Sequence, residues 1–125
     1  MTPSPAARDA LFKAFARALF TRDIEALYKV VTPDFVWSYH DGLSLTRVLP
    51  SPETIRVHME ERKDFYSAHR FHDVVYHHLP EVSFMTFELS ETVRATGEIR
   101  KQSGIERYTF KDDRIALKDV YRKPA

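Results

Sequence analysis

The sequence predicts an α+β domain in which helices pack on one face of a curved antiparallel sheet. Three observations support this prediction. The first half of the chain has the apolar periodicity of helices around one short aromatic strand, the second half has turn residues between strand-like runs, and no repeat, linker or low-complexity segment separates the halves. A length of 125 residues suits a single domain, 1–125, with a real core.

Residues 6–31 are expected to form a helical hairpin. The first helix has apolar side chains at steps of three and four, namely Leu11, Phe12, Phe15, Ala18 and Leu19. Asp23 can cap a second helix over 24–31, and Pro33 stops that helix. The chain is therefore expected to begin with two packed helices before its first strand.

The next stretch is predicted to form one strand and one apolar loop. Residues 34–41 are aromatic and β-branched, so Phe35, Trp37 and Tyr39 would share one face of a strand. The segment from Leu43 to Pro50 carries apolar side chains without a clean period. We therefore expect this segment to lie over the domain as a loop, in the position of a lid.

A third helix and a four-stranded meander complete the predicted order. A serine–proline pair at positions 51 and 52 is a start signal for a helix over 51–67. Residues 70–122 then follow the pattern of four antiparallel strands. Turns or breaks between these strands are expected at Pro80, Gly104 and Asp112-Asp113.

The longest strand of the meander is predicted over Val82–Glu98. Its odd-numbered positions from Met85 to Ala95 are apolar and its even-numbered positions are polar, which is the pattern of a half-buried strand. Glu91 interrupts the apolar row. A carboxylate in such a position is costly unless it is paired, hydrogen-bonded or protonated, so Glu91 is the first candidate for a functional residue.

Composition and charge exclude several classes of function. Nineteen Lys and Arg against 18 Asp and Glu leave a net charge of +1 with both signs interspersed, so no nucleic-acid partner is expected. The chain has no cysteine, which excludes disulfides and thiolate chemistry. Without a signal-peptide pattern or a membrane-spanning apolar run, we expect a cytoplasmic protein with no membrane partner. Aromatic residues, at 13%, are numerous enough to line a cavity.

The element order and three motifs resemble the nuclear transport factor 2-like superfamily, and within it the SnoaL-like and ketosteroid isomerase-like branch. The motifs are Asp23-Ile-Glu-Ala-Leu27, Pro33-Asp-Phe-Val-Trp37 and Tyr108-Thr-Phe-Lys-Asp-Asp-Arg-Ile115, and the resemblance covers nearly the whole chain. It implies a cone-shaped, cystatin-like sheet with three helices on its concave face. It also implies an apolar pocket inside the cone and a homodimer formed through the outer face of the sheet.

The resemblance further implies where a ketosteroid isomerase would carry its chemistry. The oxyanion-hole tyrosine of that family falls on Phe15, which has no hydroxyl group. The general-base aspartate falls on Tyr39, a far weaker base with an unperturbed pKa of about 10. The protonated aspartic acid falls on Glu106, which keeps a carboxyl group. Because two of the three roles are lost, ketosteroid isomerisation by that mechanism is not expected.

Glu91 and Glu106 are the predicted catalytic residues. They occupy the apolar faces of adjacent predicted strands, and burial in an apolar cavity raises the pKa of a carboxyl group toward the range of a general acid or base. Two facing carboxyl groups would push their pKa values apart, so that one could act as an acid and the other as a base. The alternatives are that Glu91 pairs with Arg94 or Arg107 or turns outward at a bulge, and that Glu106 is exposed.

The predicted ligand-binding residues are Phe15, Trp37, Tyr39, His58, Phe87, Leu89 and Tyr108. Tyr39 offers a hydroxyl group and Trp37 a flat wall, and the alternative for both is packing in an aromatic core. His58, beside the expected lid, is a candidate proton shuttle, and the alternative is a partly exposed helix histidine. Asp119 is explained by pairing with a cross-strand Lys or Arg.

No metal or cofactor is expected. The cluster of His69, His72, His77 and His78 has no metal-ligand spacing, and His40-Asp41 is a lone pair at the end of a strand. With only three glycines, the chain has no phosphate-binding loop for a nucleotide.

Two functional hypotheses follow. The first is a homodimer that binds a small, mostly apolar molecule inside the cone and isomerises, dehydrates or cyclises it by acid–base chemistry with Glu91 and Glu106. The second is a non-catalytic dimeric ligand-binding or assembly module. An open pocket beneath Leu43–Leu49 with unpaired carboxyl groups would favour the enzyme. A pocket closed by aromatic side chains, with Glu91 paired to an arginine, would favour the module.

Overall fold

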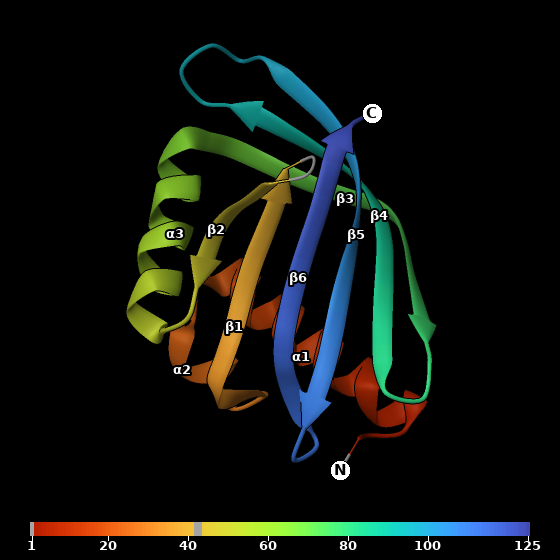
Figure 1. Cartoon of the computed structure of the whole chain (residues 1–125). Helices are drawn as coiled ribbons and strands as arrows, with labels where there is room; N and C mark the ends of the chain where they lie inside the picture. The colour runs from red at the N-terminus through yellow and green to blue at the C-terminus, as the bar shows by residue number, and fades with distance from the viewer. Residues whose placement is uncertain (1, 42–43) are drawn as a thin grey trace.

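The computed structural model describes residues 2–41 and 44–125, and in them one six-stranded sheet carries three helices on one face (Figure 1). The helices are α1 (Pro5–Thr21), α2 (Ile24–Leu27) and α3 (Pro52–Phe65). The strands are β1 (Val31–Asp41), β2 (Ser44–Leu49), β3 (Tyr66–His78), β4 (Val82–Val93), β5 (Ile99–Lys111) and β6 (Arg114–Pro124). The predicted α+β class, with helices on one face of a curved sheet, is confirmed.

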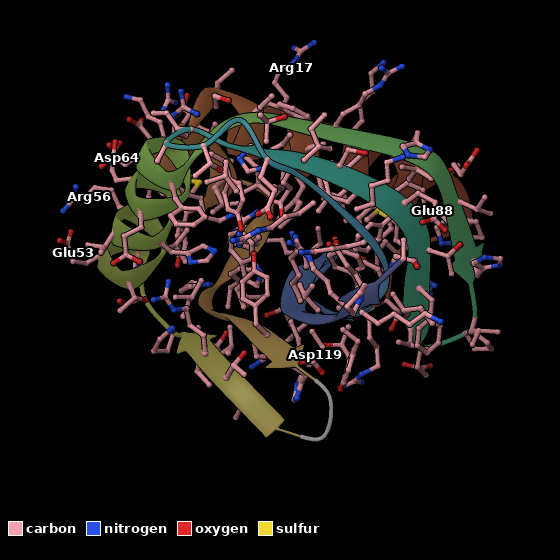
Figure 2. All side chains as sticks on the ribbon, turned by 90° about the horizontal axis from the view of Figure 1, so that it is seen from above. Arg17, Glu53, Arg56, Asp64, Glu88 and Asp119 are labelled. Carbon is pink, nitrogen blue, oxygen red and sulfur yellow. The ribbon has the colours of Figure 1, made fainter. Side chains whose placement is uncertain are left out.

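The sheet is mixed, with the order β2-β1-β6-β5-β4-β3. The four strands β3 to β6 form the predicted antiparallel meander, and β1 pairs antiparallel with β2. However, β1 and β6 are parallel. After β1 the chain passes through β2 and α3 to β3 at the opposite edge, and the meander then runs back across the sheet to β6, which lies beside β1. Seen from above, the sheet curves around a space filled by side chains, while Glu53, Arg56 and Asp64 of α3 point outward (Figure 2).

Helix α1 supplies much of the core on the concave face. It begins at Pro5 after Ser4, whose side chain accepts a hydrogen bond from the backbone N–H of Ala7, as a helix cap does. Its buried side includes Phe12 and Phe15, and the Phe12 ring centre lies 4.7 Å from that of Tyr108 on β5. The apolar stripe predicted for this helix therefore faces the sheet.

The segment predicted as an apolar lid is a strand. Residues 44–49 form the edge strand β2, in which Trp37 pairs with Leu49 and Tyr39 with Arg47, so the prediction of a loop over the domain is wrong. Leu49 is buried but Leu45 and Val48 are exposed, because an edge strand beside a curved sheet presents only part of its surface to the core. Gly42 and Leu43 lie outside the described residues.

Two predicted elements are shorter than expected. Helix α2 ends at Leu27 rather than at residue 31, because the β-branched residues Val31 and Thr32 begin β1 instead. Strand β4 ends at Val93 rather than at Glu98, and a turn follows in which the N–H of Val93 donates to the carbonyl of Glu98. Gly97 has a φ of 74° in this turn, a conformation that favours glycine.

Gly104 does not break its segment as predicted, and β5 runs through it from Ile99 to Lys111. A Cβ atom at position 104 would lie 2.5 Å from the Phe87 ring and 2.7 Å from the carbonyl oxygen of Tyr121. Glycine is therefore used here for close approach between three strands, rather than for a turn.

Strand β6 faces the cone with residues other than those that its simple alternation predicts. Simple alternation would place Ile115, Leu117, Asp119 and Tyr121 on one face, but the pairing with β5 shifts register near Ile115, with Phe110 opposite Ile115 and Thr109 opposite Leu117. This bulge changes the alternation beyond it. As a result, Lys118 and Val120 are buried on the inner side, and Tyr121 is exposed on the outer side.

Candidate functional site

Glu91 lies on the concave face of β4, as its strand period predicts, and its side chain is 1% exposed. It forms an ion pair with Arg62 from α3 and a hydrogen bond with His69 from β3, the latter at 2.8 Å. Arg122 from β6 lies 3.6 Å from its other carboxylate oxygen. Glu91 is thus paired, but with Arg62 and Arg122 rather than with the Arg94 or Arg107 that the sequence analysis named.

The pKa of Glu91 is shifted in the direction opposite to the predicted one. Burial alone would raise the pKa of this carboxyl group, but the hydrogen bond from His69 and the charges of Arg62 and Arg122 outweigh burial and lower it. The expectation of a raised pKa failed because the carboxyl group lies among cations and not in an apolar cavity. At neutral pH Glu91 is a carboxylate.

Glu106 and Tyr108 on β5 form a second buried polar group together with Lys118 on β6. The Tyr108 hydroxyl donates a hydrogen bond to Glu106, and the Lys118 ammonium lies 3.6 Å from a Glu106 carboxylate oxygen. Glu106 is 2% exposed, so the alternative of an exposed strand residue is wrong. Lys118 Nζ also lies 4.2 Å from the ring centre of Trp37 and 5.0 Å from that of Phe15, which are cation–π distances.

Lys118 has a pKa close to neutral pH. Burial lowers the pKa of this amine to about 8, the charge of Glu106 opposes that effect, and the charges of Arg122 and Arg62 add to it. An amine with this pKa exchanges a proton readily near pH 7–8, whereas an ordinary lysine holds its proton. Lys118 is therefore the group in the cone best suited to proton transfer.

Tyr39 and His58 form a third group at the edge beside β2. His58 Nε2 lies 3.1 Å from the Tyr39 hydroxyl, and His58 Nδ1 lies 2.8 Å from Arg47, which also binds Glu61 at 3.0 Å. Burial and the neighbouring cations lower the pKa of His58 to about 3. His58 therefore stays neutral at physiological pH and does not titrate there, contrary to the prediction of a proton shuttle. It is also buried rather than partly exposed.

The two predicted catalytic carboxyl groups do not face each other. In the β4–β5 pairing, Glu106 lies opposite Met85 and Glu91 lies opposite Arg100. The six steps from Met85 to Glu91 correspond to roughly 20 Å along the strand. Each carboxylate therefore interacts with its own cations, and the two do not form an acid–base pair with each other.

The predicted ligand-binding residues belong to one buried layer. Phe15, Trp37 and Tyr108 surround Lys118 and Glu106, and the Phe87 ring lies 5.9 Å from the Arg122 guanidinium. All of the set except Tyr39 are nearly inaccessible, namely Phe15, Trp37, His58, Phe87, Leu89 and Tyr108. Their binding roles remain predictions, because the same burial makes them core residues.

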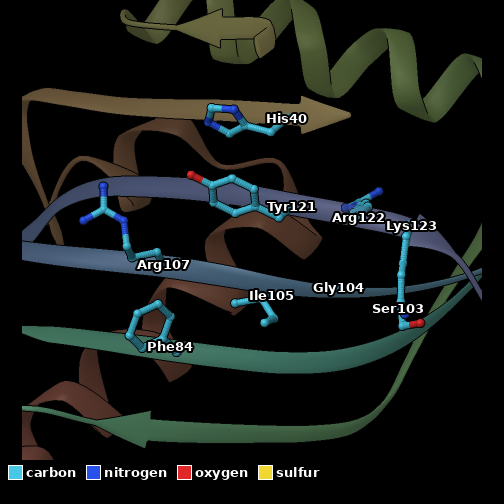
Figure 3. A pocket seen from close by; sticks show the side chains of 9 residues that line it. All are labelled: His40, Phe84, Ser103, Gly104, Ile105, Arg107, Tyr121, Arg122 and Lys123. Atoms are coloured by element: carbon cyan, nitrogen blue, oxygen red, sulfur yellow. The ribbon is translucent and has the colours of Figure 1, made fainter. Parts of the chain in front are cut away.

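The outer face of the sheet carries a separate hollow of about 610 Å³, shown in Figure 3. It is lined by Phe84, Ile105, Tyr121 and Arg107 among others, and the ring of His40 stacks on that of Tyr121 at 4.4 Å. A second hollow of about 530 Å³ lies at the N-terminal segment between residues 2 and 11. Neither hollow is lined by Glu91, Glu106 or Lys118, and all three side chains are buried on the concave side.

Asp119 is explained by structural pairing, as predicted. It accepts hydrogen bonds from Arg107 on β5, at 2.7 Å, and from Ser38 on β1. In the part of the chain that the structure describes, no group of three or more His, Cys, Asp or Glu side chains is arranged to hold a metal ion. None of the described helices is both long enough and apolar enough to cross a membrane.

Sequence reasoning missed Arg62, Lys118 and Arg122, three cations that lie beside Glu91 or Glu106 on the concave side. Lys118 and Arg122 were missed because the bulge in β6 changes which residues face inward. Arg62 falls on the apolar stripe of α3 together with Ile55 and Met59. An arginine on such a stripe, like a carboxylate in an apolar row, is the signal that could have identified it.

The curved sheet with three helices on its concave face is the fold that the sequence resemblance implied. The family model of the SnoaL-like domain matches residues 12–118, and the chain therefore belongs to the SnoaL-like family. No curated protein is similar enough in sequence to count as a match.

Several solved structures share this fold at low sequence identity. An NTF2-like protein from Burkholderia xenovorans LB400 is 12% identical with a TM-score of 0.80, over 96% of this chain and 92% of that one. A proposed SnoaL-like polyketide cyclase from Jannaschia sp. CCS1 is 10% identical with a TM-score of 0.78, over 97% and 90%. TerC, crystallised with polyporic acid, is 12% identical with a TM-score of 0.74, over 95% and 92%. At these identities the likeness establishes the fold alone.

Proposed function

We propose that this protein binds a small, mostly apolar molecule inside the cone and catalyses its isomerisation, dehydration or cyclisation by acid–base chemistry. The observation that carries the proposal is the buried pair of Lys118 and Glu106, 3.6 Å apart within a wall of aromatic rings. A desolvated amine beside a carboxylate is a common arrangement for moving protons at neutral pH. The fold neighbours add support, since one is a proposed polyketide cyclase and another was crystallised with polyporic acid.

The two carboxylates have different roles in this proposal. Glu106, as a carboxylate, accepts the proton from the substrate carbon, and proton transfer between Glu106 and Lys118, 3.6 Å apart, returns the pair to its starting state after each turnover. Lys118, with its pKa of about 8, returns a proton to the substrate. Glu91 remains ionised and holds Arg62 and Arg122, whose side chains are 24% and 16% exposed. Its role is to position these arginines.

The test is proton exchange at carbon, which does not require the natural substrate. The protein would be incubated with 2-tetralone in D2O, and deuterium incorporation beside the ketone would be followed by NMR. We expect catalysed exchange, reduced by about a hundredfold in both Glu106→Gln and Lys118→Met, since general acid–base groups contribute about 10²–10⁴. Glu88→Gln, on the outer side of β4, is the matched control and should exchange as the unmodified protein does. Exchange that is unaffected by Glu106→Gln would contradict the proposal.

A second candidate function is favoured by a specific observation. Glu91 is paired to two arginines, and the enclosed layer is packed with aromatic side chains, which is the arrangement expected of a non-catalytic ligand-binding or assembly module. Calorimetric binding of 2-tetralone without any protein-dependent exchange would support this module in place of the enzyme.

We also propose that the protein is a homodimer formed through the outer face of the sheet. Ile105 and Tyr121 are 44% and 42% exposed there, beside the hollow of Figure 3. A second copy would cover these apolar side chains. Light scattering after size exclusion should give twice the mass of the chain for the unmodified protein and a single-chain mass for Ile105→Asp. A monomeric unmodified protein would contradict this proposal.

A further inference from the structure

Resting on the proposed function, we propose that the cone selects apolar ligands with one negatively charged oxygen group, and that Tyr39, Trp37 and Arg122 bind this group. Acid–base chemistry at Lys118 and Glu106 does not by itself require a charged ligand. The ligand class is therefore apolar monoanions such as carboxylates, phenolates and enolates.

The hydrogen bonds of His58 leave the Tyr39 hydroxyl as a donor. Arg47 can only donate, so the His58 Nδ1 atom, 2.8 Å away, must accept. A neutral imidazole then carries its proton on Nε2, which donates to the Tyr39 oxygen at 3.1 Å. Burial raises the pKa of Tyr39 to about 12, so the hydroxyl keeps its own hydrogen. That hydrogen is available to a ligand oxygen, and the chain of donors behind it strengthens the bond.

Two further donors lie against Tyr39. Among the residues that the structure describes, the indole Nε1 of Trp37 and the Nε of Arg122 are buried without a hydrogen-bond partner. The Trp37 and Tyr39 ring centres are 5.5 Å apart, and the Arg122 guanidinium lies 5.5 Å from the Tyr39 ring centre. Trp37 is 5% exposed. Buried donors without partners carry a free-energy cost that an anionic oxygen atom would remove.

The charge of the enclosed layer fits a single negative charge on the ligand. In the group around Glu91 and Glu106, the cations Arg62, Lys118 and Arg122 face two carboxylates, which leaves one positive charge in excess. The charge of Arg47 is offset by Glu61, 3.0 Å away. The same excess lowers the pKa of His58, on which the charges of Arg62, Arg47, Lys118 and Arg122 all act after burial. A monoanion would neutralise the layer, whereas a neutral ligand would leave the charge uncompensated.

The experiment compares 2-naphthoate with 2-naphthamide, which share the naphthalene skeleton and differ in charge. Affinities would be measured by isothermal titration calorimetry. Trp37 is the only tryptophan of the chain, so its indole N–H gives a single signal in a ¹H–¹⁵N NMR spectrum. We expect 2-naphthoate to bind about tenfold more tightly, as a charge-assisted hydrogen bond provides, and to shift the indole proton further downfield.

Variants distinguish the proposed donors from general charge attraction. Tyr39→Phe and Arg122→Gln should each remove most of the preference for 2-naphthoate while changing the affinity for 2-naphthamide by no more than about twofold. Binding of 2-naphthamide also shows that each variant retains its fold. Arg56→Gln removes one positive charge from the outer surface of α3, where Arg56 pairs with Glu53, and should keep the preference (Figure 2).

The outcomes separate this inference from the proposed function. Equal binding of both probes would overturn the anion preference and leave a pocket for apolar molecules. Binding of neither probe would count against the pocket itself, and the inference would fall with it. A preference that Arg56→Gln weakens as much as Arg122→Gln does would also overturn the inference, because it would reflect net charge alone.

Discussion

Replacing Glu91 by glutamine should cost the fold about 2–3 kcal/mol at pH 7. Removing one member of a buried ion pair costs about 3–5 kcal/mol, because the opposite charge is left without compensation. Here the carboxylate is 1% exposed, but the side chains of Arg62, Arg122 and His69 are 24%, 16% and 30% exposed, so water recovers part of that cost. For a chain of this length, the melting temperature should fall by roughly 10 °C.

Urea unfolding followed by circular dichroism at several pH values is the measurement. The folded-state pKa of Glu91 is lowered, so its contribution is present above the unfolded-state pKa of about 4.3 and is lost as the pH falls through the folded-state value. The unmodified protein and Glu91→Gln should therefore converge in stability below about pH 4. Glu88→Gln, half-buried on the outer side of the same strand, should behave as the unmodified protein does. A difference under about 0.5 kcal/mol at pH 7, or one that persists in acid, would refute the reasoning.

Three further predictions concern single positions. Gly104→Ala should destabilise the protein by about 1–3 kcal/mol in urea unfolding, because the new Cβ would overlap the Phe87 ring at 2.5 Å; an unchanged midpoint would contradict this. Arg8→Met should lower the free energy of unfolding by about 3 kcal/mol, because the buried guanidinium donates to five acceptors and links α1 to the β3–β4 hairpin. A melting temperature within 2 °C of the unmodified protein, which corresponds to about 0.5 kcal/mol, would contradict this prediction. The lowered pKa of Lys118 implies that stability rises from pH 8 toward pH 10, as the unfolded chain binds the extra proton, and Lys118→Met should flatten that rise.

The inner face of β4 could be predicted from sequence, whereas the partners of Glu91 could not. The strict period of two identifies Glu91 as an inward carboxylate among Met85, Phe87 and Leu89, and all four are buried. His69 stands opposite Glu91 on the neighbouring strand β3, but Arg62 and Arg122 come from α3 and β6, which approach β4 only after the sheet has curved. The pKa of Glu91 depends on them, so the predicted direction was wrong.

Two features depended on tertiary structure in other ways. Strand β2 has no alternation of its own, and its extended form comes from pairing with β1 between Trp37 and Asp41. In β6 one bulge next to Ile115 reverses the alternation, which turns Lys118 inward. The local sequence pattern indicates neither the pairing of β2 nor the bulge in β6, so Lys118 could not be predicted to face inward.

The pair of Lys118 and Glu106 is best understood as a feature that costs stability. Burying both charges carries a desolvation penalty that an ion pair at 3.6 Å repays only in part, and the lowered pKa of Lys118 reflects that penalty. The double variant Lys118→Met with Glu106→Gln removes both charges, while the amide can still accept the Tyr108 hydrogen bond. We expect this variant to equal or exceed the unmodified protein in stability, by up to about 2 kcal/mol in urea unfolding, and to lose proton exchange. A double variant that is less stable by more than about 1 kcal/mol would mean that the pair serves the fold, and the case for acid–base chemistry at this position would lose its physical basis.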